Sequence, residues 1–103
     1  MLTSAKTQSQ AEHWLSFFRS ERRGKLVGAQ TSGANGTITG VQLPGGYGLT
    51  FTGMFVRHRD GSRFHAIGHI PDVEVEPTIE DLRQGRDAVL LRALAELNRE
   101  RPR

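Results

Sequence analysis

Two stretches decide the fold: Thr7-Gln8-Ser9-Gln10-Ala11-Glu12 near the start of the chain and Gly68-His69-Ile70-Pro71-Asp72-Val73-Glu74-Val75 near its end. The first predicts a helix start, because Ser9 is a suitable N-cap and Glu12 three residues later completes a capping box. The second closes a glycine-rich β region with a turn and a short strand. A serine at a helix start lies beside free backbone N–H groups at the positive end of the helix dipole. Its hydroxyl can therefore serve as a nucleophile as well as a cap.

The remaining elements follow from periodicity and turn signals. An amphipathic helix is expected from Gln10 to Arg22, because apolar side chains recur there at three- and four-residue spacing. Strands are expected at residues 25–28, 37–42, 48–57 and 62–67, with Asp60-Gly61 as a hairpin signal between the last two. A capped turn at 78–82 and a leucine-striped helix capped by Asp87 follow. The order predicts an α/β fold, helix–mixed β-sheet–helix, as a single domain over residues 1–103.

Composition excludes several classes of function. The 103 residues have room for one small domain. A mean hydropathy of -0.47 and the lack of a long apolar run predict no membrane span. The chain has no cysteine, which rules out disulfides, thiolate metal sites and a cysteine nucleophile. Lys and Arg number 14 against 11 acids, and the arginines form three short clusters with few interleaved aromatics, so nucleic-acid binding is not predicted.

The histidines and glycines do not form a metal or phosphate motif. His65 and His69 have the spacing to share a strand face, yet no carboxylate stands at metal-ligand spacing beside them, so no metal site is predicted. The glycines lack a Walker lysine and a Gly-x-Gly-x-x-Gly run into a helix, so no cofactor is predicted. His13 lies four residues after Ser9 on the same helix face, and a hydrated surface histidine is its simpler interpretation. Asp72 is interpreted as shaping the turn after Pro71.

Several short motifs of this chain occur in the order and at the spacing of a known protein family. The chain resembles the C-terminal part of the catalytic domain of the tail-specific, or C-terminal processing, serine peptidases. It is most similar to the branch with the tricorn core protease and the interphotoreceptor retinoid-binding protein repeats. The resemblance covers residues 2–97 and implies a partial crotonase-like (Clp-protease-like) domain. Its motifs are Leu2-Thr3-Ser4, Ser9-x-Ala-Glu12, Leu26-Val27-Gly28, the loop 31–36, Leu43-Pro44-Gly45-Gly46, Leu49-Thr50, Asp60-Gly61 and Gly68-x-x-Pro-Asp72.

The resemblance implies a catalytic site. Ser9 matches the nucleophile that attacks a peptide or protein substrate, and the Gln10 N–H is the local donor to the oxyanion. The substrate-cleft loop corresponds to Gly33, Ala34, Asn35 and Gly36. In the lysine-dependent branch the base stands at the position of Ala34, so a serine–lysine dyad is not expected here. The tricorn-like branch takes a histidine from upstream of the matched segment. We therefore expect a segment of a serine peptidase domain with little activity of its own.

Two other interpretations stay open. One is a non-catalytic module that binds a hydrophobic ligand or a peptide in the cleft of the fold. The other is an assembly piece that completes a partner chain, since the stub at residues 2–4 leaves a strand edge exposed. Pairing of that edge with a second copy predicts a homo-oligomer.

Overall fold

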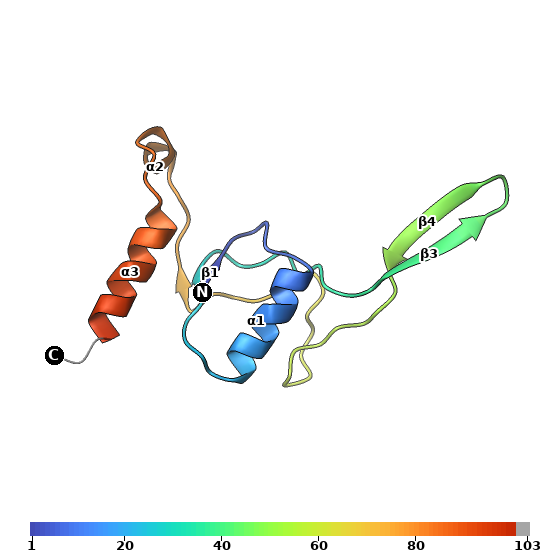
Figure 1. The fold of residues 1–103 in the computed structure, drawn as a ribbon, viewed down its shortest axis with the longest axis horizontal. Coiled ribbons are helices and arrows are strands. Elements are labelled where there is room, and N and C mark those ends of the chain that lie inside the picture. Colours follow the sequence, from blue (N-terminus) through green and yellow to red (C-terminus); the bar gives the residue numbers. More distant parts are fainter. Residues whose placement is uncertain (101–103) are drawn as a thin grey trace.

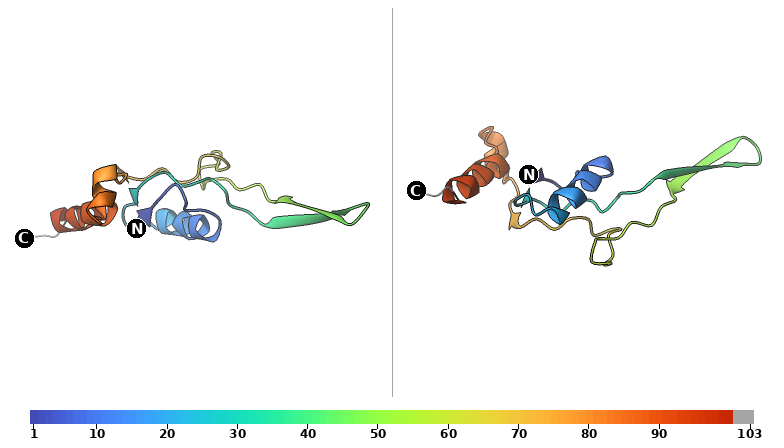
Figure 2. Two further views of the ribbon diagram at one scale, coloured as in Figure 1. Left: turned by 90° about the horizontal axis from the view of Figure 1, so that it is seen from above. Right: turned by 60° about the horizontal axis from the view of Figure 1, so that its bottom comes forward.

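The structure, a computed structural model, describes residues 1–100 in three parts along one axis (Figure 1). A central body around α1 stands between α2 and α3 at one end and the β3–β4 hairpin at the other, and all three views agree (Figure 2). The extents are 65 × 36 × 16 Å. The elements are β1 (Leu2–Thr3), α1 (Gln10–Ser20), β2 (Val27–Gly28), β3 (Ile38–Leu43), β4 (Tyr47–Thr52), β5 (Val73–Glu74), α2 (Ile79–Arg83) and α3 (Ala88–Glu100).

The strands form two separate sheets. A parallel sheet has the order β1-β2-β5, with Leu2 paired to Val27 and Val27 to Val73. The antiparallel hairpin β3–β4 turns at the predicted Pro44-Gly45-Gly46 and keeps its register from Ile38↔Thr52 onward. The predicted α/β class is confirmed, and the expected mixed β region is divided between a parallel and an antiparallel sheet.

Two predicted strands are wrong in part or in full. The strand expected at 48–57 ends at Thr52, because β3 offers it no partner beyond Ile38. The strand expected at 62–67 is a turn, in which the N–H groups of Ile67 and Gly68 donate to the Phe64 carbonyl. Phe64 is fully buried and Ala66 has φ 62°, which an extended strand does not allow. Between these segments, Asp60-Gly61 closes a tight turn with one bridge, Arg57↔Arg63.

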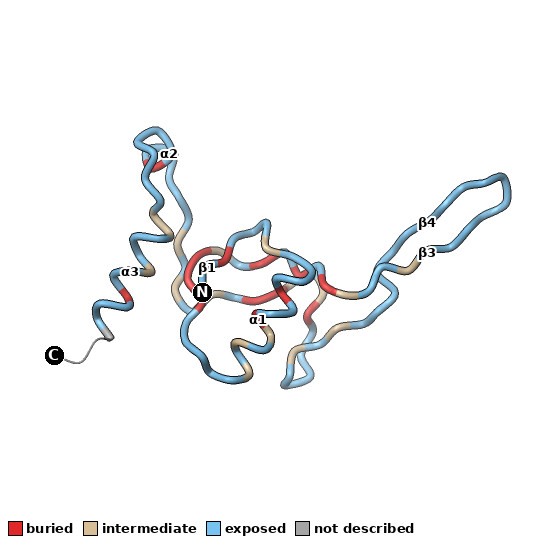
Figure 3. The backbone as a smooth tube through the Cα atoms, in the orientation of Figure 1, coloured by how far each residue is buried: buried red, intermediate tan, exposed pale blue. Residues whose placement is uncertain are grey.

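The interior of the molecule is small. The buried hydrophobic side chains are Leu15, Leu26, Val27 and Phe64. Figure 3 shows the buried residues gathered in the central body, while the hairpin is almost wholly exposed. The radius of gyration is 17.5 Å, against about 13 Å for a compact domain of about 100 residues. Much apolar surface therefore stays in contact with solvent.

The C-terminal helices begin at the predicted caps. Thr78 caps α2, and the Asp87 carboxylate accepts from the Leu90 N–H at 2.9 Å. α3 lies against β1 and β2, where Lys25 and Glu96 approach to 3.5 Å. The predicted leucine stripe of α3 is present, but Leu90, Leu91, Leu94 and Leu97 are 44–63% exposed.

The cap of α2 predicts a dependence of stability on pH. Hydrogen bonds from the Thr78 hydroxyl, then the Thr78 N–H, then Arg86, lower the pKa of Asp81 to about 2. Because this folded-state pKa lies below the ordinary value of 3.8, the stabilisation is complete above pH 3.8 and is lost as pH falls toward 2. We expect Asp81→Asn to remove this part of the acid transition, measured as the difference in helical circular dichroism between the variant and the unaltered chain. Identical acid transitions in both proteins would contradict the assignment.

Candidate active site

Ser9 occupies a strained turn between β1 and α1. Its backbone has φ 53° and ψ -122°, a conformation that non-glycine residues rarely adopt. The side chain is exposed. It faces the Glu12 backbone as in a capping box, but its hydroxyl makes no cap hydrogen bond to the helix. A serine raised on a sharp strand-to-helix turn is the geometry that exposes a nucleophilic hydroxyl. It occurs here without the Gly-x-Ser-x-Gly motif.

Glu12 organises this turn from the inside. Its carboxylate is fully buried and accepts four hydrogen bonds. These come from Thr31 Oγ1 at 2.5 Å, Gly33 N at 2.7 Å, Ala34 N at 3.0 Å and Ser9 N at 3.2 Å. A buried carboxylate is stable only when such donors replace its lost water. One side chain thus joins the Ser9 turn to the loop 31–34.

The loop that follows β2 lies directly against Ser9. The Ala34 carbonyl accepts from the Ser9 N–H at 2.8 Å, and Asn35 beside it is buried. Gly33, with φ 69°, packs so closely on the turn 66–68 that a Cβ would stand 2.5 Å from Ile67 N. The structure therefore places Gly33 and Ala34 against the Ser9 turn, with Gln10 and Asn35 next to them along the chain. Gly36 instead lies against Thr52 and Met54 at the base of the hairpin. The roles of these residues in catalysis remain predictions.

The first N–H of α1 belongs to Gln10. Among the described residues no acceptor bonds to this N–H, as is usual for the first turn of a helix. It follows Ser9 directly, so it can donate to an oxyanion formed at the serine. The arrangement can therefore provide a nucleophile and one oxyanion donor.

His69 closes the inner side of α1. It is 2% exposed, and its Nε2 lies 3.0 Å from the Glu12 carbonyl and 3.2 Å from Ser16 Oγ. Because a carbonyl only accepts, Nε2 carries the proton, and Nδ1 is left buried without a partner. Burial lowers the pKa of His69, and the charges of His58 and Arg19 act in the same direction. His69 is thus a structural histidine in its neutral form at neutral pH.

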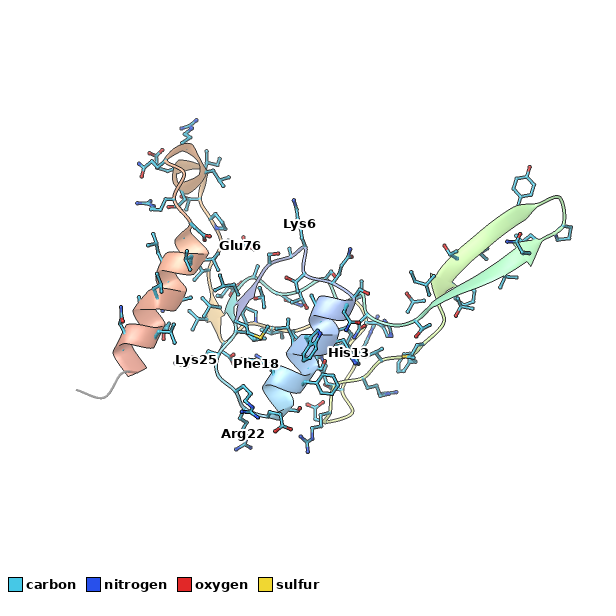
Figure 4. All side chains as sticks on the ribbon, viewed as in Figure 1. Lys6, His13, Phe18, Arg22, Lys25 and Glu76 are labelled. Carbon is cyan, nitrogen blue, oxygen red and sulfur yellow. The ribbon has the colours of Figure 1, made fainter. Side chains whose placement is uncertain are left out.

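No base is placed beside the serine in the part of the chain that the structure describes. The ring of His13 packs edge-on against Phe17, with 5.0 Å between centroids, and no hydrogen bond joins it to the Ser9 hydroxyl. Lys6 projects from the β1–α1 turn away from α1, whereas Lys25 follows the other end of that helix (Figure 4). The Ser9 hydroxyl itself has no hydrogen bond within residues 1–99, so the geometry supplies no activated dyad.

The described residues contain neither a metal-binding cluster nor a membrane-spanning helix. No group of three or more histidine, cysteine or acidic side chains is arranged to hold a metal ion. None of the helices in residues 1–100 has the length and apolar character needed to cross a bilayer. The predicted even-spaced face of His65 and His69 is wrong, because residues 65–67 form a turn and His65 Nε2 instead accepts from the Val56 N–H at 2.9 Å.

Sequence reasoning missed two residues that shape the site. The sequence predicts a capping-box role for Glu12, but three of its four donors come from residues 31–34. The sequence predicts only a loop position for Thr31, yet its hydroxyl donates to the Glu12 carboxylate and accepts from the His69 N–H at 2.8 Å. The sequence does contain a signal for this role. Glu12 lies among the apolar positions of α1, three residues before Leu15 and therefore on the same face of the helix. An acid on a buried helix face requires distant donors.

Comparison with known proteins gives a family match that includes the Ser9 turn and the loop after β2. The family model described as peptidase family S41 matches residues 1–75. No protein of curated function matches the sequence. Several solved structures do, among them one described as a peptidase and the tricorn protease.

Three structural neighbours illustrate the match. A predicted peptidase from Parabacteroides merdae ATCC 43184 is 26% identical with a TM-score of 0.84, over 93% of this chain and 30% of that one. Mature CPAF complexed with lactacystin is 25% identical with a TM-score of 0.81, over 93% and 19%. The tricorn protease is 27% identical with a TM-score of 0.76, over 96% and 10%. The chain thus spans less than a third of each neighbour. These matches confirm the partial crotonase-like fold and the resemblance to the tricorn branch of the tail-specific peptidases.

Proposed function

Because this chain belongs to peptidase family S41, we propose that Ser9 is the nucleophile of a serine peptidase domain of the tail-specific type. The observation that supports this most is the φ of 53° at Ser9 on a strand-to-helix turn. A helix cap does not need that conformation, since an ordinary N-cap lies in the extended region, as Thr78 does with φ -82°. The strain at Ser9 is therefore best explained by exposure of its hydroxyl.

The proposed reaction is hydrolysis of a peptide bond in a peptide or protein substrate. The Ser9 oxygen attacks the carbonyl carbon and the proton of the hydroxyl passes to a base. The Gln10 N–H stabilises the oxyanion, while the segment 33–36 forms one wall of the substrate cleft. Collapse of the intermediate returns the proton to the leaving amine, and water then releases the acyl group from Ser9.

We further propose that residues 1–103 form one segment of the domain and that the base comes from outside this segment. Two features support this. Ala34 stands where the lysine-dependent branch has its base, and no hydrogen bond from a described side chain reaches the Ser9 hydroxyl. We expect the chain by itself to hydrolyse peptides weakly or not at all. Robust hydrolysis that disappears in Ser9→Ala would contradict the external base, but not the role of Ser9.

Supplying a base in solution tests whether Ser9 is the nucleophile. The chain is treated with a fluorophosphonate, with and without imidazole as an added base, and the adducts are located by mass spectrometry. We expect slow labelling of Ser9 that imidazole accelerates, because the turn and the Gln10 N–H are already in place. Ser32→Ala, which removes another exposed serine of the same region, is the matched control and should not change the labelling. Labelling of Ser9 no faster than that of Ser32, with or without imidazole, would overturn the proposal.

A second candidate function, assembly with another polypeptide, is favoured by the exposed apolar surface. Trp14 and Phe17 of α1 are 63% and 54% exposed, and the outer edge of β1 has no strand beside it in the described sheet. Surface of this extent marks an interface in most soluble proteins. We propose that the rest of a peptidase domain, or a second copy of the chain, covers these faces.

The oligomeric state of the chain tests this second candidate. We expect self-association in sedimentation velocity, reduced by the paired substitution Trp14→Glu and Phe17→Glu on the exposed face of α1. Arg83→Glu on the exposed face of α2 is the matched surface control and should leave the association unchanged. A well-folded monomer at high concentration would count against assembly.

A further inference from the structure

A basic groove of about 820 Å³ lies beside the C-terminal half of α1, away from Ser9. Its walls are the second half of α1, the turn 57–63 and the segment 67–70. Arg19 lies ten residues after Ser9, about 15 Å along the helix. The groove contains one carboxylate, Asp60, and the five arginines Arg19, Arg22, Arg57, Arg59 and Arg63.

Hydrogen bonds to the backbone position four of the five arginines. Arg57 donates to the Gly61 carbonyl at 2.8 Å, Arg63 donates through Nε to the His65 carbonyl at 2.9 Å, and Arg59 reaches the Ser20 carbonyl at 3.4 Å. Among the described residues, Arg19 is the only member of the five that pairs with a carboxylate, Asp72 at 3.2 Å. Each guanidinium has five donors, so most of this donor capacity stays available.

The remaining polar groups of the groove do not neutralise it. Asp60 accepts from the N–H and the hydroxyl of Ser62, at 2.9 and 2.6 Å, which lowers its pKa and keeps it in this turn. His69 lines the groove with Nδ1 buried and unpartnered. Five arginines against Asp60 give the groove a formal charge of +4, which is more than the net +3 of the whole chain. A groove of this kind attracts an anionic ligand.

We propose that the groove binds an acidic segment of a peptide, whose carboxylates pair with the unused donors of Arg22, Arg57, Arg59 and Arg63. Arginine forks match carboxylates in bidentate geometry. The binding does not depend on a catalytic role of Ser9, so it is a separate inference from the peptidase activity.

The groove suits a peptide better than a nucleic acid. Binding of single strands uses exposed aromatic rings on which bases stack. Phe64 is fully buried, and the ring of His58 packs on it with 5.0 Å between centroids. The exposed ring of Phe55 is covered by the Arg57 guanidinium, 4.9 Å from its centroid. The groove therefore offers charge without a free stacking surface.

Fluorescence anisotropy with a labelled glutamate–glycine repeat peptide tests the proposal. We expect saturable binding that weakens with added salt, and no comparable binding of the matched glutamine–glycine peptide. The double variant Arg22→Gln/Arg59→Gln should weaken binding about tenfold, since it removes two charges from the groove without removing a short hydrogen bond. The double variant Arg23→Gln/Arg83→Gln removes equal charge from outside the groove and should leave the affinity nearly unchanged. Ser9→Ala should bind as the unaltered chain does.

A second readout locates the ligand without any substitution. The imidazole of His69 faces Arg19 and the backbone of Glu12 from α1, and His58 from the turn 57–63. A carboxylate bound in the groove should raise the pKa of His69 in an NMR titration of the unaltered chain, because it offsets the positive charge of Arg19. The proposal would be overturned if both double variants lost affinity for the peptide equally, or if the pKa of His69 did not change under saturating peptide. It would also be overturned if a single-stranded oligonucleotide bound more tightly than the peptide at the same salt concentration.

Discussion

Glu12→Ala is expected to unfold the central body of the molecule. The carboxylate is the acceptor for Thr31 Oγ1, Gly33 N and Ala34 N, and no other acceptor among the described residues bonds to these donors. A buried donor left without an acceptor costs about 1–3 kcal/mol, so three of them cost about 3 kcal/mol or more. A domain of this size has about 5–15 kcal/mol of stability when its core is complete. Among the described residues only four hydrophobic side chains are buried.

Urea unfolding followed by circular dichroism measures this loss. Glu12→Gln keeps the shape and one acceptor oxygen but places an NH₂ group among donors, so we expect an intermediate loss. Glu21→Ala removes an exposed carboxylate just after the same helix and should change stability by no more than about 0.5 kcal/mol. A free energy of unfolding in Glu12→Ala equal to that of Glu21→Ala would show that the buried network does not hold the turn.

Gly68→Ala is expected to disrupt the same junction from the opposite side. A Cβ on Gly68 would collide with Thr31 Oγ1, Gly33 N and Glu12 Oε1, and the backbone there has φ 69°. The Gly33 N–H belongs to the main chain, so it cannot avoid the Cβ by a change of side-chain rotamer. The loop 31–34 must therefore move away from Glu12, which breaks the hydrogen bonds that hold it beside Ser9. We expect a loss of about 3 kcal/mol, similar to that of a disrupted buried network.

Gly61→Ala separates the two causes of the lost stability, which are the positive φ of the backbone and the collision of the added Cβ. Gly61 also has positive φ, 83°, but a Cβ there would meet no atom within 4 Å. It should therefore show the backbone cost alone, about 1–2 kcal/mol. The two variants are compared by urea unfolding, together with the rate of imidazole-assisted labelling at Ser9. Equal losses of stability, or labelling in Gly68→Ala as fast as in the unaltered chain, would mean that contact at Gly68 does not position the serine turn.

Local interactions explain what could be predicted from the sequence. The start of α1 after Ser9, the cap of α2 at Thr78 and the cap of α3 at Asp87 depend on contacts three residues apart, which composition and spacing reveal. The hairpin turn at 44–46 is likewise a property of proline and glycine. The family motifs identified the region around Ser9 because they preserve both residue types and their spacing.

Long-range contacts explain what could not be predicted. Residues 62–67 have strand-forming composition, yet burial of Phe64 and the bond from Ala66 N to the Gly33 carbonyl turn them into a compact loop. The arginines at 19–23 and 57–63 are two surface clusters in the sequence and become the walls of one groove when the turn meets α1.

By itself, the sequence determined the helices, the caps of α2 and α3, the hairpin and the placement of a serine at a helix start, because each depends on neighbours along the chain. Only the tertiary structure decided that Glu12 receives donors from residues 31–34, that Ser9 adopts positive φ and that five arginines surround one groove. The physical reason is that a buried carboxylate or a cluster of like charges is defined by groups brought close in space. Local propensity carries no information about those groups.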